Sequence, residues 1–300
     1  MSIPVILDTD IGMDVDDVWA LAFLMCCPEL DLKLVVSENG DTEYAAALAA
    51  KLLTIAERDD VPVGVGIPLT STPRTHLPWL ADFTLADYVG AVHRDGVGAM
   101  IDQINASPEP VTIVAIGPVT NLAAALQRDP SIADKVRFVG MHGSVRKGYL
   151  GAPKPHLEYN VKAYPQACRM VFEAAWPMTI TPLDTCGTVM IRGDAFEALL
   201  QSDKPLVRAV MDNHRIWTGT FGEKLYKQVD LTRQSSLLFD TVAVYLAFAE
   251  DLLKMEDLGL RVADDGATVI DDSAKSIRCA MEWNDQQAFE ALLVERLLGY

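Results

Sequence analysis

Basic residues and cysteines are scarce in this 300-residue sequence. Lysine and arginine together number 25 against 42 aspartates and glutamates, which gives a formal net charge of −17. Nucleic-acid binding depends on basic side chains that neutralise phosphates, so a nucleic acid polymer is disfavoured as partner and a small neutral or cationic substrate is favoured. The five cysteines include the adjacent pair Cys26 and Cys27 but no C-x-x-C motif. This argues against a disulfide framework and against a zinc site.

Long apolar runs and targeting signals are missing as well. No apolar run approaches the roughly 18 residues that a membrane span needs, and the N-terminus has no basic segment of the kind that opens a secretory signal. We therefore expect no membrane association and a cytoplasmic location. The dinucleotide fingerprint G-x-G-x-x-G is incomplete, because the third glycine is absent after Gly64-Val65-Gly66.

Strand-like and helix-like stretches alternate along the chain. Strands are predicted at 5–7, 32–37, 62–65, 111–116, 136–141 and 178–181, and helices at 44–56, 121–127, 166–173 and 241–249. This alternation predicts an α/β fold with a mostly parallel sheet flanked by helices on both faces. A single domain over residues 1–300 is expected, in which residues 187–236 are a candidate helical lid or subdomain. Strands near Val262 and Val269 close the predicted pattern, and residues 142–156 are expected to cross the surface.

An acid-rich turn follows the first predicted strand. Five aspartates occur within ten residues: Asp8, Asp10, Asp14, Asp16 and Asp17. Carboxylates this close raise one another's pKa unless a cation offsets the repulsion, and Ca²⁺ accepts several protein carboxylates more readily than Mg²⁺. A solvated loop with one aspartate as helix cap would explain only one or two of them. The spacing is not that of an EF-hand, and the predicted position, at the carboxyl edge of a sheet, is typical of ligand sites.

This turn carries a resemblance to a known family. The segment Asp8-Thr9-Asp10-Ile11-Gly12-Met13-Asp14-Val15-Asp16-Asp17-Val18-Trp19-Ala20-Leu21 resembles the signature D-x-D-x-G-x-D-D-A-x-A-L of the nucleoside hydrolase family (inosine-uridine-preferring type), with two extra residues. Three less specific matches follow in order: Gly117 to Leu122 is similar to G-P-[LV]-T-N-L, Glu158-Tyr159-Asn160 to E-F-N, and Leu238-Phe239-Asp240 to the H-D segment. The resemblance implies a Rossmann-like nucleoside hydrolase fold, hydrolysis of the N-glycosidic bond of ribonucleosides, and a homodimer or homotetramer.

The resemblance also implies a metal site and a general base. Asp10, Asp17, Asp240 and the backbone carbonyl of Thr120 would hold one Ca²⁺, and Asp10 would deprotonate the attacking water. Calcium lowers the pKa of such a water and gathers ribose hydroxyls. Carboxylates stabilise the positive charge of an oxocarbenium-like transition state.

Ribose and base contacts are implied in the same way. Asp16, Glu158 and Asn160 would bind the ribose hydroxyls, and Asp14 could replace Asp16 because the place of the two extra residues is open. Asn39 and Asp41 are rivals for a further ribose contact. The remaining candidates for substrate binding are His93, Met141, Trp217 and Phe239. Of the aromatic candidates, Trp79, Trp217 and Tyr226 could stack on a base, although aromatic residues are more often part of the core.

Two departures from the family pattern affect the substrate side. Phe239 stands where the family usually has a histidine, and it cannot protonate a leaving base. We expect either a substrate whose base leaves without this proton or an acid supplied by the loops, with His93, His142 and His214 as candidates. Ala152 stands where an asparagine is usual near the 5′ end of the sugar. We therefore expect the 5′-hydroxyl to contribute little, with Glu158 alone to bind it.

Other functions and structural roles compete with this interpretation. Asp8-Thr9-Asp10 also resembles the start of a haloacid-dehalogenase-type phosphatase that uses Mg²⁺, but Gly12 fits that class poorly. A metal-stabilised nucleoside or ribose binding protein without turnover is the non-enzymatic alternative. Asn121 could simply cap the helix that follows it. Release of ribose, of phosphate, or of neither would separate the three functions.

Overall fold

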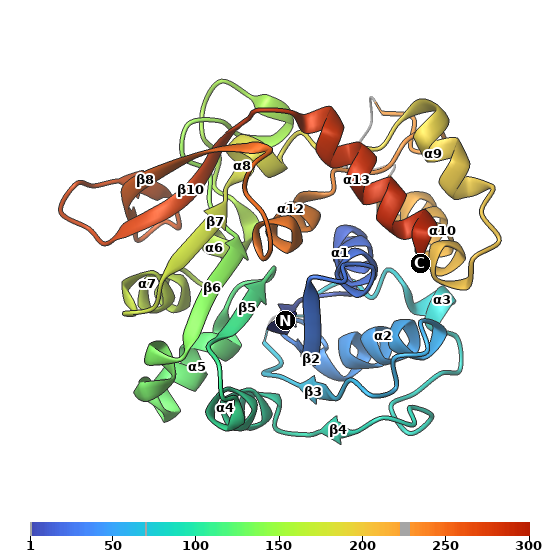
Figure 1. The fold of residues 1–300 in the computed structure, drawn as a ribbon, viewed down its shortest axis with the longest axis horizontal. Coiled ribbons are helices and arrows are strands. Elements are labelled where there is room, and N and C mark those ends of the chain that lie inside the picture. Colours follow the sequence, from blue (N-terminus) through green and yellow to red (C-terminus); the bar gives the residue numbers. More distant parts are fainter. Residues whose placement is uncertain (1, 70, 223–228) are drawn as a thin grey trace.

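The computed structural model describes residues 2–69, 71–222 and 229–300. Within these residues one mixed sheet of ten strands forms the centre, in the order β4-β3-β2-β1-β5-β6-β7-β10-β8-β9 (Figure 1). The parallel part consists of β1 (Ile3–Thr9), β2 (Leu30–Ser37), β3 (Val63–Val65), β4 (Val92–His93), β5 (Val111–Ala115), β6 (Val136–Met141) and β7 (Met178–Thr181). The predicted α/β class with a mostly parallel sheet is confirmed.

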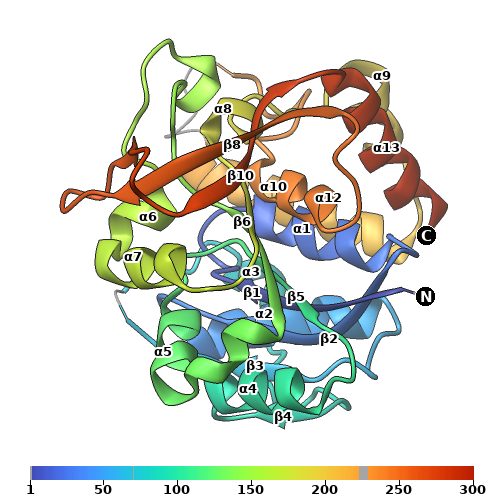
Figure 2. The same ribbon diagram turned by 60° about the vertical axis from the view of Figure 1, so that its left-hand side comes forward.

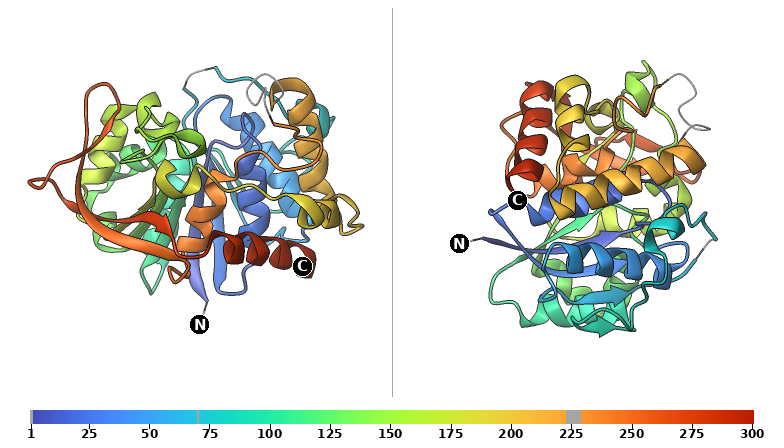
Figure 3. Two further views of the ribbon diagram at one scale, coloured as in Figure 1. Left: turned by 90° about the horizontal axis from the view of Figure 1, so that it is seen from above. Right: turned by 90° about the vertical axis from the view of Figure 1, so that its right-hand side faces the viewer.

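The strands after β7 make the sheet mixed. β10 (Ser276–Trp283) pairs parallel with β7, whereas β8 (Leu253–Val262) pairs antiparallel with β10, and β9 (Thr268–Ile270) antiparallel with β8. This ribbon curves over the side of the molecule opposite α9 (Gly193–Leu200) and α10 (Pro205–Trp217) (Figures 1 and 3). The sequence pattern predicts strands near Val262 and Val269 but does not predict β10.

Helices cover both faces of the sheet, as Figure 2 shows. One apolar cluster includes α1 (Asp16–Met25), α2 (Thr42–Ile55), α10, α12 (Phe239–Leu246) and α13 (Gln286–Gly299). The other includes α4 (Gly96–Ala106), α5 (Thr120–Arg128) and α7 (Pro165–Glu173). Successive side chains of a strand point to opposite faces, so Val5 and Leu7 join the first cluster and Ile6 the second. Because such strands are buried on both faces, their sequences are continuous apolar runs.

The remaining helical elements are short. They are α3 (Leu77–Leu80), η1 (Pro130–Asp134), η2 (Tyr149–Gly151), α6 (Tyr159–Ala163), α8 (Leu183–Cys186) and the π turn η3 (Thr218–Gly222). None of the helices in the described part of the chain has the length and apolar composition needed to cross a membrane.

Residues 187–236 contain α9 and α10, which pack in the same apolar cluster as α1. Their role as a lid stays a prediction, and residues 223–228 of this range lie outside the described residues. The C-terminal helix α13 was missed, although its signal is present: Phe289, Leu293 and Leu297 are spaced to form one buried stripe, and Asp285 caps the helix by accepting a bond from Ala288 N.

Candidate functional site

A cavity of about 750 Å³ opens at the carboxyl ends of β1, β5 and β6, where Asp10, Ile116 and Met141 line it. The chain places β2 to β4 on one side of β1 and β5 to β7 on the other. The cavity therefore lies at the topological switch point, where open α/β sheets bind ligands. Nine of the residues predicted from the sequence line it: Asp10, Asp14, Asp16, Asp17, Met141, Glu158, Asn160, Phe239 and Asp240.

Three of these carboxylates form what we call the acid cluster: Asp16, Asp17 and Asp240. One oxygen from each lies within 4.8 Å of the others, and all three side chains are buried. They come from the first turns of α1 and α12, which pack against each other, and helix N-termini favour negative charge. Burial and the neighbouring carboxylates raise the pKa of all three well above the usual range. A divalent cation would relieve this repulsion, and the all-oxygen donor set suits such an ion.

Asp10 lies beside the acid cluster. Burial and the charge of Glu38 raise the pKa of Asp10 to about 8. Asn39 donates a hydrogen bond from Nδ2 to Asp10 Oδ2 at 3.4 Å and to Tyr159 Oη at 3.2 Å. Burial raises the pKa of the neighbouring Asp14 to about 6. A carboxyl group with a pKa near neutrality is suited to accept a proton from water.

A second row of buried polar side chains, Glu38 and Asn121, supports the carboxylates that line the cavity. The sequence pattern predicts no function for this row. Glu38, at the end of β2, accepts bonds from Val119 N (2.9 Å), Thr120 N (2.9 Å) and Thr120 Oγ1 (3.1 Å). A Cβ at residue 117 would lie 2.4 Å from Glu38 Oε1, so Gly117 is needed for this approach. An acid directly after an apolar strand was the available signal, because Glu38 follows β2 as Asp10 follows β1.

Asn121 belongs to this second row. Its Nδ2 donates to Asp8 Oδ1 at 2.8 Å and to the Ser37 carbonyl at 3.0 Å, and its Oδ1 accepts from Ile67 N at 3.0 Å. The interpretation of Asn121 as a helix cap is wrong, because Val119 is the N-cap of α5 and makes no side-chain cap bond. Asn121 instead orients Asp8, the first acid of the turn.

Glu158 and Asn160 form the opposite wall of the cavity. Glu158 caps α6 and accepts from Asn160 N (2.6 Å), Val161 N (3.1 Å) and Gly143 N (2.9 Å). Burial nevertheless raises the pKa of Glu158 to about 7. Asn160 donates from Nδ2 to the carbonyls of Ile116 (3.1 Å) and Met141 (3.0 Å), which holds this wall against the ends of β5 and β6.

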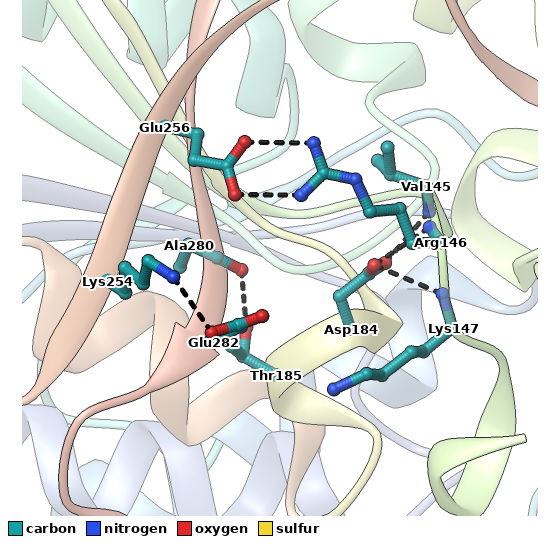
Figure 4. A network of polar contacts seen from close by, with 9 residues as sticks. All are labelled: Val145, Arg146, Lys147, Asp184, Thr185, Lys254, Glu256, Ala280 and Glu282. Atoms are coloured by element: carbon teal, nitrogen blue, oxygen red, sulfur yellow. Dashed lines mark hydrogen bonds and ion pairs between the residues drawn. The ribbon is translucent and has the colours of Figure 1, made fainter. Parts of the chain in front are cut away.

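Residues 142–156 were expected only to cross the surface, but a buried carboxylate holds the segment at its start. Asp184, on α8, accepts bonds from the backbone amides of Val145 (2.8 Å), Arg146 (2.8 Å) and Lys147 (3.1 Å). Arg146 in turn forms a bidentate ion pair with Glu256 at 2.7 and 2.8 Å. Figure 4 shows these contacts joining the segment to α8 and β8. The segment is therefore positioned before it reaches the cavity.

Several predicted contacts lie away from the cavity. Asp41 caps α2 through Tyr44 N and pairs with Arg74, so Asn39 and not Asp41 lies beside Asp10. His93 is exposed on the edge strand β4. Trp217 is fully buried, and its Nε1 donates to the Met13 carbonyl at 3.1 Å.

Two further predictions concern residues that the cavity does not include. Thr120 binds Glu38 through its amide and hydroxyl and does not line the cavity; its carbonyl as a metal ligand stays a prediction. Of the stacking candidates, Trp79 lies under the ammonium group of Lys51, 4.5 Å from the ring centre, and Tyr226 lies outside the described residues.

The histidine candidates for a leaving-group acid are also displaced from the cavity. His142 Nε2 lies 2.9 Å from the Gly117 carbonyl, and His214 Nε2 lies 2.9 Å from the Leu231 carbonyl. Burial lowers the pKa of His142 to about 4 and also lowers that of His214. Neither they nor His93 line the cavity as the described residues define it.

Comparison with known proteins places the chain in a family. The sequence model of the family described as inosine-uridine preferring nucleoside hydrolase matches residues 5–292. The non-specific ribonucleoside hydrolase RihC of Escherichia coli (strain SE11) is 31% identical over 239 residues, 75% of this chain and 77% of RihC.

Solved structures agree with this match. The plant nucleoside hydrolase PpNRh1 superposes with a TM-score of 0.83 at 23% identity over 100% of both chains. The inosine-uridine preferring nucleoside hydrolase of Bacillus anthracis superposes with a TM-score of 0.76 at 20% identity, again over 100% of both. At these identities the likeness shows the fold alone. With a family match over nearly its whole length, this chain belongs to the inosine-uridine preferring nucleoside hydrolase family and is a glycosidic-bond hydrolase.

Proposed function

We propose that this protein is a calcium-dependent ribonucleoside hydrolase that uses water activated by Asp10 to release a free base and ribose. The observation that supports it best is the buried acid cluster of Asp16, Asp17 and Asp240, with Asp10 beside it at the switch point of the sheet. The same acids and the family membership argue against a haloacid-dehalogenase-type phosphatase.

The metal would be held mainly by acids that the fold brings together. Asp17 and Asp240 belong to the acid cluster, and Asp10 and the Thr120 carbonyl would complete the ligand set. Glu38 supports the last of these by fixing the backbone at Thr120. Ca²⁺ is the preferred ion because several ligands come from the protein. When bound, it would lower the pKa of a water and gather ribose hydroxyls.

Asp10 would be the general base. Burial and the charge of Glu38 raise the pKa of Asp10 to about 8, and a bound cation would lower this pKa so that the carboxylate form is available to accept a proton. As the glycosidic bond breaks, positive charge develops on the sugar, and the buried carboxylates around it stabilise that charge. Asn39, which donates to Asp10, would keep the carboxylate oriented.

The substrate would lie between the acid cluster and the opposite wall. Asp16 or Asp14 would bind ribose hydroxyls on one side, and Glu158 and Asn160 on the other. Beyond the sugar the cavity is apolar, with Phe221, Val229, Leu237 and Phe239 around the space for the base. Apolar walls do not select among hydrogen-bonding patterns, so we propose that both purine and pyrimidine nucleosides are accepted. A cytoplasmic homodimer or homotetramer is proposed from the sequence and the family resemblance.

A screen of ribonucleosides by reducing-sugar assay tests the proposed function. Uridine, cytidine, inosine and adenosine would be incubated with the purified protein in CaCl₂, with and without excess EGTA. We expect ribose release that EGTA abolishes and added Ca²⁺ restores. The variant Asp10→Asn is the matched control, because it changes one atom of the side chain. Binding without ribose release would favour the non-enzymatic alternative, and phosphate release from a phosphomonoester would favour the phosphatase.

A further inference from the structure

The 3₁₀ turn η2 (Tyr149–Gly151) holds one aromatic side chain at the cavity. Leu150, which has a left-handed backbone (φ 58°), donates from its amide to the Gly187 carbonyl at 3.0 Å. Ala152 N donates to the Tyr149 carbonyl at 3.2 Å, and Tyr149 N donates to His156 Nδ1 at 3.3 Å. Asp184 holds the preceding amides in place. The position of Tyr149 is therefore set before a substrate binds.

The ring and the hydroxyl of Tyr149 have different surroundings. The ring packs edge to face against Phe239 and tilted against His156, with 5.7 Å between centres in both pairs. The hydroxyl lies near the amide of Tyr159 and near the charge of Glu158; burial and this charge raise the pKa of Tyr149. The phenol thus keeps its proton. A protonated phenol can donate its O–H to a group bound in the cavity.

The geometry of a ribonucleoside decides what meets this hydroxyl. In a β-ribonucleoside the base and the 5′-hydroxymethyl group project from one face of the sugar, and the 2′- and 3′-hydroxyls project from the other. A diol that faces the acid cluster therefore turns the base and the 5′ group towards the opposite wall. Phe239 lines an apolar part of the cavity, whereas Glu158 and Tyr149, whose hydroxyl lies near the charge of Glu158, line a polar part. Because an unpaired buried hydroxyl is unfavourable, the 5′-hydroxyl matches the polar part.

We propose that the Tyr149 hydroxyl donates a hydrogen bond to the ribose 5′-hydroxyl, which makes Tyr149 a specificity-determining residue. Glu158 accepts from the same hydroxyl, so the group has both a donor and an acceptor. Tyr149 supplies the bond that Ala152, three residues later in the same turn, cannot make with its methyl group. The proposal therefore predicts a larger contribution of the 5′-hydroxyl than Ala152 alone indicates. This proposal rests on the proposed function, because it assumes a ribonucleoside in the cavity.

The test pairs a change in the enzyme with a change in the substrate. The variant Tyr149→Phe keeps the ring contacts with Phe239 and His156 and removes only the hydroxyl. We expect kcat/KM for uridine to fall by about tenfold, the scale of one neutral hydrogen bond, and kcat/KM for 5′-deoxyuridine to change by less than about twofold. For the wild type, kcat/KM should be about tenfold or more lower with 5′-deoxyuridine than with uridine. Tyr88→Phe is the control, since the Tyr88 hydroxyl donates to the Val61 carbonyl at 2.6 Å and does not line the cavity.

Four results would overturn the assignment. Equal losses on uridine and 5′-deoxyuridine would mean that Tyr149 acts only through the structure of the turn, and no loss on either would mean that it makes no contact. A loss on uridine without a loss on p-nitrophenyl β-D-ribofuranoside, which keeps the 5′-hydroxyl but has a better leaving group, would assign Tyr149 to the base instead. A wild type that hydrolyses none of the three substrates would refute the proposed function, and the proposal about Tyr149 with it.

Discussion

Removing divalent metal with EGTA should destabilise this protein, and the effect should grow with pH. The acid cluster has three buried carboxylates within 4.8 Å of one another, and Asp10 lies beside them. Without a cation these groups must be protonated or repel one another, and burial together with the charge of Glu38 raises the pKa of Asp10 to about 8. Calcium and protons therefore compete for the same oxygens, and calcium binding releases protons.

The expected size of the destabilisation follows from the linkage between calcium binding and folding. Calcium at about 1,000 times its dissociation constant stabilises the folded state by roughly 4 kcal/mol. A chain of this size shifts its melting temperature by about 2 °C per kcal/mol, so chelation should lower Tm by about 8 °C.

The pH dependence has a definite sign. A group whose pKa is raised on folding stabilises the protein below its unfolded pKa, and this stabilisation is lost as pH rises through the folded value. For Asp14 this stabilisation is lost between about pH 4 and about pH 6. For Asp10 it is lost between about pH 4 and about pH 8. The metal-free protein should therefore weaken over this range, at about 1.4 kcal/mol for each unit of pKa shift, while bound calcium removes most of the loss.

Thermal unfolding followed by calorimetry at pH 5, 7 and 9, in CaCl₂ or in EGTA, measures this directly. The difference in Tm between the two conditions should be small at pH 5 and largest at pH 9. Asp17→Asn, which removes a charge from the acid cluster, should reduce that difference at pH 9. Equal Tm values in CaCl₂ and EGTA at pH 9, or a difference that shrinks as pH rises, would refute the reasoning.

Three further predictions follow from the site. Asp10→Asn should lower kcat by at least roughly 10²-fold, the usual scale for loss of a general base, in stopped assays of ribose release; turnover close to wild type would place the base elsewhere, with Asp14 the next candidate. We expect elemental analysis to find calcium in the wild type and in Asp212→Ala, which removes a surface acid on α10, but not in Asp240→Ala. Asp184→Ala leaves three backbone amides without their acceptor and should lower the free energy of unfolding in urea by about 1–3 kcal/mol. It should also raise KM more than it changes kcat. An unchanged KM would show that residues 145–147 do not position the cavity wall.

The sequence by itself determined the fold class and the location of the site. Apolar runs such as Val111 to Ala115 are long enough for buried strands, and their alternation with helical stretches leaves few arrangements besides a parallel sheet. The acids Asp10 to Asp17 follow the first strand directly, so their place at the carboxyl edge is a local consequence of strand direction. Local patterns of this kind survive folding because they depend only on neighbours in the chain.

Only the tertiary structure decided which distant residues share the site. Asp240 reaches Asp16 and Asp17 because α12 packs on α1, a contact between the two ends of the chain that no local pattern encodes. Trp217 is an aromatic residue within the predicted lid, yet packing buries it and its indole N–H donates to the Met13 carbonyl. Tyr149 lies in a segment that is polar and irregular in sequence, and it faces the cavity because a buried carboxylate elsewhere in the chain holds the preceding amides. Residue type sets what a side chain can do, but burial and partners, which come from contacts distant in sequence, decide what it does.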